Sequence, residues 1–328
     1  MKRQLIWLAL FAMPFGASAL DGKGLNGGGK GCLNVTGGGG STWSVCDNFT
    51  TDNAAPTGGS CAGGMAGVGA SISDAEIVTG AITSGDAFDD GVNVWVNNVI
   101  VGGIVTTAAN RATYAPTTRS GLTVNMRYDF LTTESTERTF VSFTNPSQSP
   151  ISATITYTTN FGSDGSTVVN ATSSGDAVFT TADRWLVTSD GNESDPVNTT
   201  VLWSGTPRVV PNTATTTVYD CAATNGALAT YPVSVPAGGT VSLVFFQRLT
   251  ETLAQATATA AQFNDLQPAS PLLAGLTPTE IAQAQNIAGG PPPPPPRPPV
   301  AVPLSPQGLG VLAGLLALLG LIVVRRRA

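Results

Sequence analysis

The sequence predicts an all-β protein whose body is a β-sandwich, with one or two short helices near its C-terminal end and a single C-terminal transmembrane helix. Short runs of alternating apolar and polar residues recur between residues 76 and 265, and a period of two is typical of half-buried strands. Turn sequences such as GSDG, SSGD and PAGG separate the runs, which favours a sandwich. A run of 16 apolar or glycine residues near the end of the chain predicts the membrane helix.

The chain begins with the features of a secretory signal peptide. Lys2 and Arg3 precede a short apolar run, and Ala17-Ser18-Ala19 fits the small-x-small pattern of a cleavage site. We therefore expect residues 1–19 to direct the chain to the export translocon and to be removed by signal peptidase.

Residues 20–75 are rich in glycine, and we expect them to form an irregular segment because they hold too few apolar side chains for a core of their own. An even number of cysteines in an exported chain indicates two disulfide bonds, with three possible pairings. Cys32 and Cys46 enclose a short loop and form the natural local pair. Cys61 and Cys221 would then tie this segment to the body.

The body, residues 76–265, contains seven clear strand-like runs. They are GVNVWVNNVIV, LTVNMRYDFLT, TFVSFTN, ISATITYTTNF, RWLVTSD, TTTVYDCA and TVSLVFFQRL. Threonine, valine and aromatic residues suit such pleated, half-buried surfaces. The stretch YPVSVPAGGTVSLVFF predicts a hairpin, because Gly238-Gly239 can adopt the positive φ of a tight connection.

Two helices are expected near the end of the body. Apolar residues recur at helical spacing in TETLAQATATAAQF. Within the segment 266–290, Thr277-Pro278-Thr279-Glu280 forms a capping box with proline at the first helical position, which predicts a helix at about 278–287. Leu276 and Ile281 can form the accompanying hydrophobic staple.

Residues 291–301, PPPPPPRPPVA, form a proline-rich linker that we expect to be an extended, semi-rigid spacer. A docking site for a polyproline-binding domain is the alternative. The apolar run 309–324 follows in the segment 302–328 and would reach about 24 Å as a helix, slightly less than a bilayer core. The arginines after it predict a cytoplasmic end, with the body outside.

The signature residues Val302-Pro303-Leu304-Ser305 precede this run, and Arg325, Arg326 and Arg327 end it. This tail resembles the PEP-CTERM sorting tails of Gram-negative bacteria, most closely the IPTL-CTERM variant. The family's Thr between Pro303 and Leu304 is absent, and Gln307 stands where the family often has Trp. The resemblance covers residues 302–328 and implies recognition by an exosortase-like membrane protease, with cleavage near the signature. A permanent inner-membrane anchor is the alternative.

The charge of the chain argues against nucleic acid as a partner. The chain has 15 Lys and Arg against 21 Asp and Glu, and five of the basic residues lie in the terminal segments. The exported part therefore carries 10 positive and 21 negative charges, and such an acidic body repels phosphate backbones. The chain has no histidine, which excludes Ser-His-Asp and Cys-His catalysis and makes a zinc site improbable.

Carboxylates are the remaining candidates for chemistry. A pair for glycoside cleavage could come from Asp86, Asp89, Asp90, Glu134, Glu137, Asp183 or Glu193. Calcium is the candidate cofactor, because it favours several oxygens from one loop. Two clusters offer them, namely Asp86, Asp89 and Asp90, and Asp190, Asn192, Glu193 and Asp195. Solvated turn carboxylates are the simpler interpretation of both.

These observations favour an exported, C-terminally sorted protein of the cell surface or extracellular matrix that acts by adhesion or display without catalysis. It would be held transiently at the inner membrane and could bind surface glycans. The alternative is a carbohydrate-binding or carbohydrate-active protein on a large β-sandwich. A cleft with two carboxylates and several exposed tryptophans would favour that alternative, although Trp43, Trp95, Trp185 and Trp203 lie in strand-like sequence that favours core packing.

Overall fold

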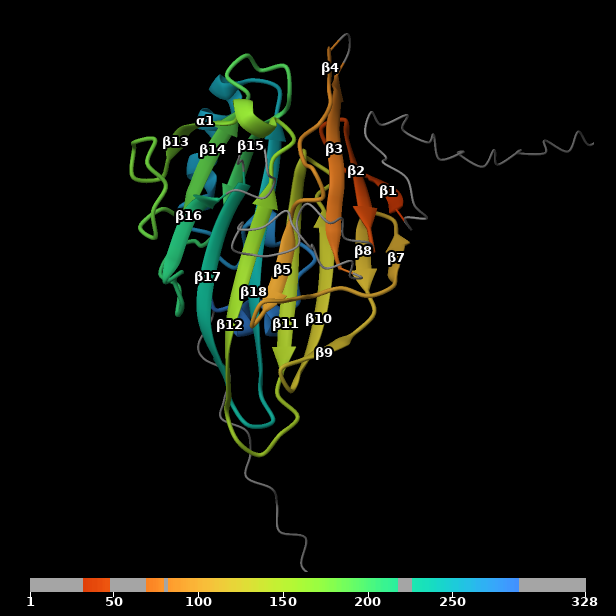
Figure 1. Cartoon of the computed structure of the whole chain (residues 1–328), viewed down its shortest axis with the longest axis vertical. Coiled ribbons are helices and arrows are strands. Elements are labelled where there is room, and N and C mark those ends of the chain that lie inside the picture. Colours follow the sequence, from red (N-terminus) through yellow and green to blue (C-terminus); the bar gives the residue numbers. More distant parts are fainter. Residues whose placement is uncertain (1–31, 48–68, 80–81, 218–225, 289–328) are drawn as a thin grey trace, which may run out of the picture. The chain divides into compact units, whose positions relative to one another are not determined.

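The computed structural model describes residues 32–47, 69–79, 82–217 and 226–288. These residues form mostly antiparallel β-structure in three sheets (Figure 1). The all-β class is therefore confirmed. No helix among the described residues is long and apolar enough to cross a membrane. The expected signal peptide 1–19, linker 291–301 and tail 302–328, with its helix 309–324, lie outside the described residues.

The N-terminal sheet corrects the expectation of an irregular segment at 20–75. Its strands in spatial order are β1 (Cys32–Thr36), β2 (Ser41–Cys46), β3 (Ser71–Thr79) and β4 (Ile82–Ser84). Cys32 and Cys46 pair in the β1–β2 register and form the expected disulfide. Its few apolar residues suffice because Trp43 and Val45 join the core of the body and need no core of their own. Cys61 and Cys221 lie outside the described residues.

The largest sheet has nine strands. Eight follow one another in the spatial order β13 (Val168–Thr172), β14 (Trp185–Ser189), β15 (Val197–Val201), β18 (Thr240–Thr250), β11 (Thr136–Thr144), β10 (Leu122–Phe130), β8 (Arg111–Tyr114) and β7 (Val105–Ala108). The ninth, β9 (Thr117–Arg119), pairs with β10.

A five-stranded sheet completes the β-structure and lies in front of the nine-stranded sheet in Figure 1. Its order is β16 (Thr213–Thr217), β17 (Gly226–Val235), β12 (Ile151–Asn160), β5 (Asn93–Val96) and β6 (Val99–Ile100). A short 3-10 turn, η2 (Asp164–Ser166), follows β12.

One buried cluster joins all three sheets. It contains Trp43 of the N-terminal sheet, Tyr157 of the five-stranded sheet and Phe245 of the nine-stranded sheet, and the rings of Tyr157 and Phe245 stack with centroids 4.0 Å apart. Buried tyrosine hydroxyls also connect the sheets, since Tyr128 donates to the Val92 carbonyl and Tyr231 to the Leu202 carbonyl. Each ring thus packs in the core while its hydroxyl is satisfied by backbone.

The expected hairpin at Gly238-Gly239 is wrong. Gly238 does have a positive φ of 63°, but the strands that it connects, β17 and β18, belong to different sheets. The partners of β17 are β12 and β16, whereas β18 lies between β11 and β15. The turn therefore carries the chain across the core, because both edges of each strand already have other partners.

A second buried cluster covers the opposite face of the nine-stranded sheet. Four short helical elements lie over it: α1 (Leu253–Ala260), η3 (Ala261–Phe263), η4 (Pro271–Leu273) and α2 (Pro278–Gln283). The capping box of Thr277 and Glu280 is present with Pro278 inside the first turn, which confirms the expected start of that helix. The helix ends at Gln283, earlier than the expected 287. The folded body thus extends beyond the expected 76–265 at both ends.

Candidate functional site

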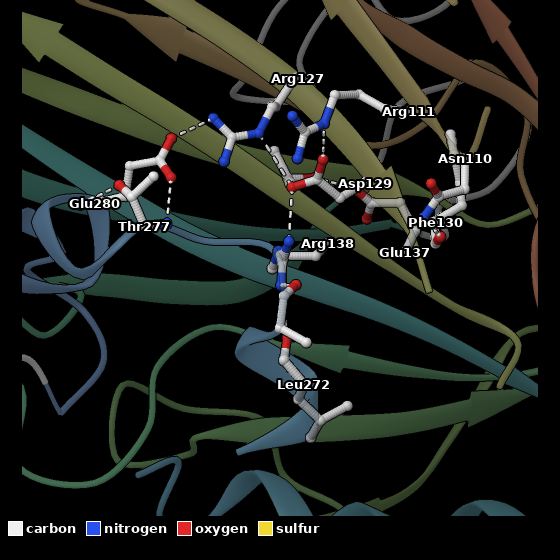
Figure 2. Close-up of polar contacts among 12 residues, drawn as sticks. Asn110, Arg111, Arg127, Asp129, Phe130, Glu137, Arg138, Leu272, Thr277 and Glu280 are labelled. Carbon is white, nitrogen blue, oxygen red and sulfur yellow. Dashed lines mark hydrogen bonds and ion pairs between the residues drawn. The ribbon is translucent and has the colours of Figure 1, made fainter. Parts of the chain in front are cut away.

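Three arginines converge on one buried carboxylate on the helix-covered face of the nine-stranded sheet (Figure 2). Asp129 accepts from Arg138 Nη2 at 2.8 Å and from Arg127 Nε at 3.1 Å, and it also pairs with Arg111. Burial opposes the ionisation of Asp129, but the arginines outweigh burial and lower its pKa. The strand register produces this grouping, since Asp129 pairs with Arg111 on β8 and with Arg138 on β11.

Two of these arginines, Arg127 and Arg138, fasten the C-terminal segment, residues 261–288, to the sheet. Arg138 Nη1 donates to the carbonyls of Leu272 at 2.8 Å and Ala274 at 2.9 Å. Arg127 Nη1 contacts Glu280 Oε1 at 2.6 Å, while Glu280 Oε2 accepts from the Thr277 amide. Burial disfavours the charged form of Glu280, but the hydrogen bonds from Arg127 and Thr277 lower its pKa. Glu280 therefore caps its helix and pairs with the sheet.

An open pocket of about 530 Å³ lies between the β10–β11 turn and the C-terminal segment. Its lining residues are Thr133, Glu134, Gln262, Ser270, Pro271 and Leu272. Arg248, of which 3% of the side chain is exposed, contacts Glu134 Oε2 at 2.5 Å and donates from Nη1 to Gln262 Oε1 at 3.0 Å. Its Nε donates to Thr136 at 2.9 Å. The guanidinium therefore holds the pocket residues Glu134 and Gln262 in place. Burial lowers the pKa of Arg248, and Glu134 opposes that effect.

The disulfide-bonded β1–β2 hairpin supports the turn that carries Glu134. The Gly38 amide donates to Leu131 at 2.7 Å, and Ser135 Oγ donates to the Gly38 carbonyl at 3.1 Å. A Cβ atom on Gly38 would lie 2.3 Å from the Glu134 nitrogen. Only glycine permits so close an approach, so the hairpin packs directly against the turn that carries Glu134.

Aspartates from several segments influence one another near the start of the body. Burial, and then the charge of Asp86, raises the pKa of Asp74 to about 7. Partial burial, and then the charges of Asp195 and Asp164, raises the pKa of Asp86 to about 6. The pKa of Asp89 rises to about 8 through burial and then through Asp86 and Asp164. Burial and mutual repulsion therefore make each member of this aspartate cluster harder to ionise than a solvated aspartate.

The calcium expectation stays a prediction. Within the described ranges, no group of three or more Asp, Glu, His or Cys side chains is arranged to hold a metal ion. In the second cluster, Asp190 accepts from the backbone amides of Asn192 and Ser194, which makes it a loop-capping residue. Burial opposes the ionisation of Asp190, but the hydrogen bond from the Ser194 hydroxyl, together with those from the backbone amides, outweighs burial and lowers its pKa. Asn192 and Glu193 are exposed, and Asp195 accepts from Ser163 Oγ at 2.9 Å.

Of the carboxylates considered for a glycosidase pair, Asp86 and Asp89 belong to the aspartate cluster, whereas Glu134, Glu137 and Asp183 lie in different surroundings. Glu134 lines the pocket, where it is the one carboxylate among the six lining residues. Glu137 is fully buried and accepts from Thr139 Oγ1 at 2.8 Å, and burial raises its pKa well above the usual range. Asp183 is also fully buried and accepts from Thr180. The pocket therefore does not supply two carboxylates for acid–base cleavage.

The four tryptophans in the described part of the chain do not form a sugar-binding platform. Trp43, Trp95 and Trp185 are buried, as the strand-like sequence around them predicted. Trp203 is partly buried, and the Arg184 guanidinium lies 4.5 Å from its ring centre. The arginines at 111, 127, 138 and 248 were missed by sequence reasoning. Arg127 and Asp129 do occupy alternate positions on one strand, which placed them on the same face, but their partners come from distant segments.

Comparison with known proteins finds structural similarity to solved proteins but no matching family. No protein-family model matches the chain, and no curated protein matches it. A solved structure of a polysaccharide lyase is similar with a TM-score of 0.41 and 11% sequence identity, over 58% of this chain. The match spans 32% of the lyase chain, about a third of its length.

Proposed function

We propose that this chain is an exported protein of the bacterial cell surface or extracellular matrix that is sorted through its C-terminal tail. Its body acts by display or adhesion and not by catalysis. The observation that carries the proposal is the Cys32–Cys46 disulfide, because disulfides persist in oxidising compartments and are rare in the cytosol. The signal-like sequence 1–19 and the tail 302–328 agree with this destination.

The attachment of the C-terminal segment also supports a display role. A tether that starts beyond residue 288 would pull on a segment that Arg138 and Arg127 bind to the central strands. Asn286 adds backbone contacts to both Val244 and Leu202. Force on the tether would therefore enter the nine-stranded sheet through several hydrogen bonds and ion pairs.

Expression of the full chain in a Gram-negative host that has an exosortase system tests this proposal. Mass spectrometry of the surface fraction should find a mature N-terminus after Ala19 and a C-terminus near Val302 to Ser305. Replacing Arg325, Arg326 and Arg327 with alanine should prevent that C-terminal cleavage while export continues. A cytoplasmic body with reduced Cys32 would overturn the proposal. An exported body that ends at Ala328 would replace sorting with permanent anchoring.

A further inference from the structure

We propose that the pocket between the β10–β11 turn and the C-terminal segment binds a neutral saccharide. This inference concerns the body alone and does not depend on the sorting tail. The pocket volume of about 530 Å³ lies within the range of about 300–1,000 Å³ that is usual for small-ligand sites.

The polar side chains of the pocket match the hydroxyl groups of a sugar. Gln262 Oε1 accepts a hydrogen bond from Arg248. The Nε2 group of this exposed side chain is therefore available as a donor to a ligand. Ser270 Oγ accepts from the Leu272 amide, so its hydroxyl hydrogen is available to a ligand. Glu134 contributes acceptor oxygens and Thr133 a further hydroxyl. Sugar hydroxyls need such a mixture because each can both donate and accept.

The charges around the pocket cancel, which favours a neutral ligand. Glu134 is the one acidic lining residue, and its carboxylate is paired with Arg248. Arg138, which donates to the carbonyl of the lining residue Leu272, is paired with Asp129. An anionic ligand would be repelled by the Glu134 carboxylate. A cationic ligand would have to compete for that carboxylate with Arg248, which is buried and already has three acceptors.

The pocket also has an apolar wall and a fixed shape. Pro271 and Leu272 provide an apolar surface for the C–H groups of a sugar ring. Arg248 orients Glu134 and Gln262 from behind, and the Phe263 ring lies 4.5 Å from its guanidinium carbon. Side chains that are held before the ligand arrives lose less entropy on binding, which raises affinity.

Isothermal titration of the full chain tests the site. The detergent should be a polyoxyethylene, because maltoside detergents carry a sugar. The probes are the neutral disaccharides cellobiose, maltose, lactose and diacetylchitobiose at millimolar concentration, with digalacturonate and deacetylated chitobiose as anionic and cationic comparisons. We expect at least one neutral probe to bind, and the two charged probes to bind more weakly.

Three variants separate the pocket from the rest of the molecule. Gln262→Leu removes the amide of an exposed side chain and should weaken binding of the neutral probe at least about tenfold, or about 1.4 kcal/mol. Gln267→Leu is the matched control, because Gln267 is exposed on the same segment but does not line the pocket. Its affinity should equal that of the wild type. Glu134→Gln leaves Arg248 unbalanced and should shift preference toward digalacturonate.

Three outcomes would overturn the inference. The first is that no neutral probe binds at millimolar concentration. The second is that Gln262→Leu and Gln267→Leu have equal effects while both retain the wild-type unfolding midpoint. The third is that a charged probe binds more tightly than every neutral one, which would show that Glu134 and Arg248 do not neutralise the site.

Discussion

Raising the pH from about 5 to about 8 should lower the free energy of unfolding, and Asp74→Asn should remove the part of that loss that Asp74 contributes. Asp86 and Asp89, whose pKa values are also raised, contribute further loss in the same direction. Asp74 lies on β3, where its Oδ1 accepts from the Ala75 amide at 2.6 Å and from the Ala87 amide at 3.1 Å. Burial, followed by the charge of Asp86, raises its pKa from 3.8 to about 7 against these hydrogen bonds. Asparagine keeps the accepting oxygen and removes the charge.

The sign and size of the effect follow from the two pKa values. Because the folded state binds the Asp74 proton more tightly, this stabilisation is fully present below the ordinary pKa of 3.8 and is lost as the pH rises through about 7. At about 1.4 kcal/mol per unit of pKa, the complete difference is about 4 kcal/mol. About 2 to 3 kcal/mol of it falls between pH 5 and pH 8. The same interval leaves Asp129 and Glu280 ionised, because their pKa values are lowered.

Urea unfolding followed by tryptophan fluorescence measures this difference. Trp43 is a suitable probe because its ring centre lies 6.2 Å from that of Phe88, directly after Ala87. Asp265→Asn is the control, since Asp265 is an exposed aspartate on the C-terminal segment. Asp74→Asn should gain stability over the wild type at the higher pH and much less at the lower one. An equal difference at both pH values, or a wild type that becomes more stable at the higher pH, would refute the reasoning.

Three further variants test the contacts that position the pocket and the C-terminal segment. Gly38→Ala should cost about 1–3 kcal/mol in urea unfolding, because a Cβ there meets the next turn at 2.3 Å; an unchanged midpoint would contradict that contact. Arg138→Met should cost about 3–5 kcal/mol by the same measurement, since it leaves buried Asp129 with fewer partners, and salt should not restore the loss. Replacing Cys32 and Cys46 with alanine should cost about 3 kcal/mol, and a reductant should lower the wild type to the same value.

The alternation of apolar residues predicted strands but not the sheets to which they belong. In β10, Leu122, Val124 and Met126 face the core as their spacing indicated. The spacing could not show that β17 and β18 lie in different sheets, because the choice depends on which other strands occupy their edges. Local rules succeeded where one segment contains the whole interaction, as in the capping box of Thr277 and Glu280.

The candidate site was hidden from the sequence for the same reason. Arg248 and Glu134 are 114 residues apart, and Arg127 and Glu280 are 153 residues apart. No local pattern joins such pairs, and scattered arginines in an acidic chain suggest solvated charges. The acidic clusters were predicted as calcium sites because their members are close together in sequence. In the structure, the Asp190 carboxylate accepts hydrogen bonds from its own turn.

The strand TVSLVFFQRL explains why the C-terminal segment folds as part of the body. Val241, Leu243 and Phe245 face the core shared by the sheets, whereas Val244 and Phe246 face the second core. A strand with both faces apolar needs a layer on each side, and the second layer consists of helices that follow it in the chain. Phe263 and Ile281 supply that layer. The cover that buries the second face therefore also forms one wall of the pocket, through Ser270, Pro271 and Leu272.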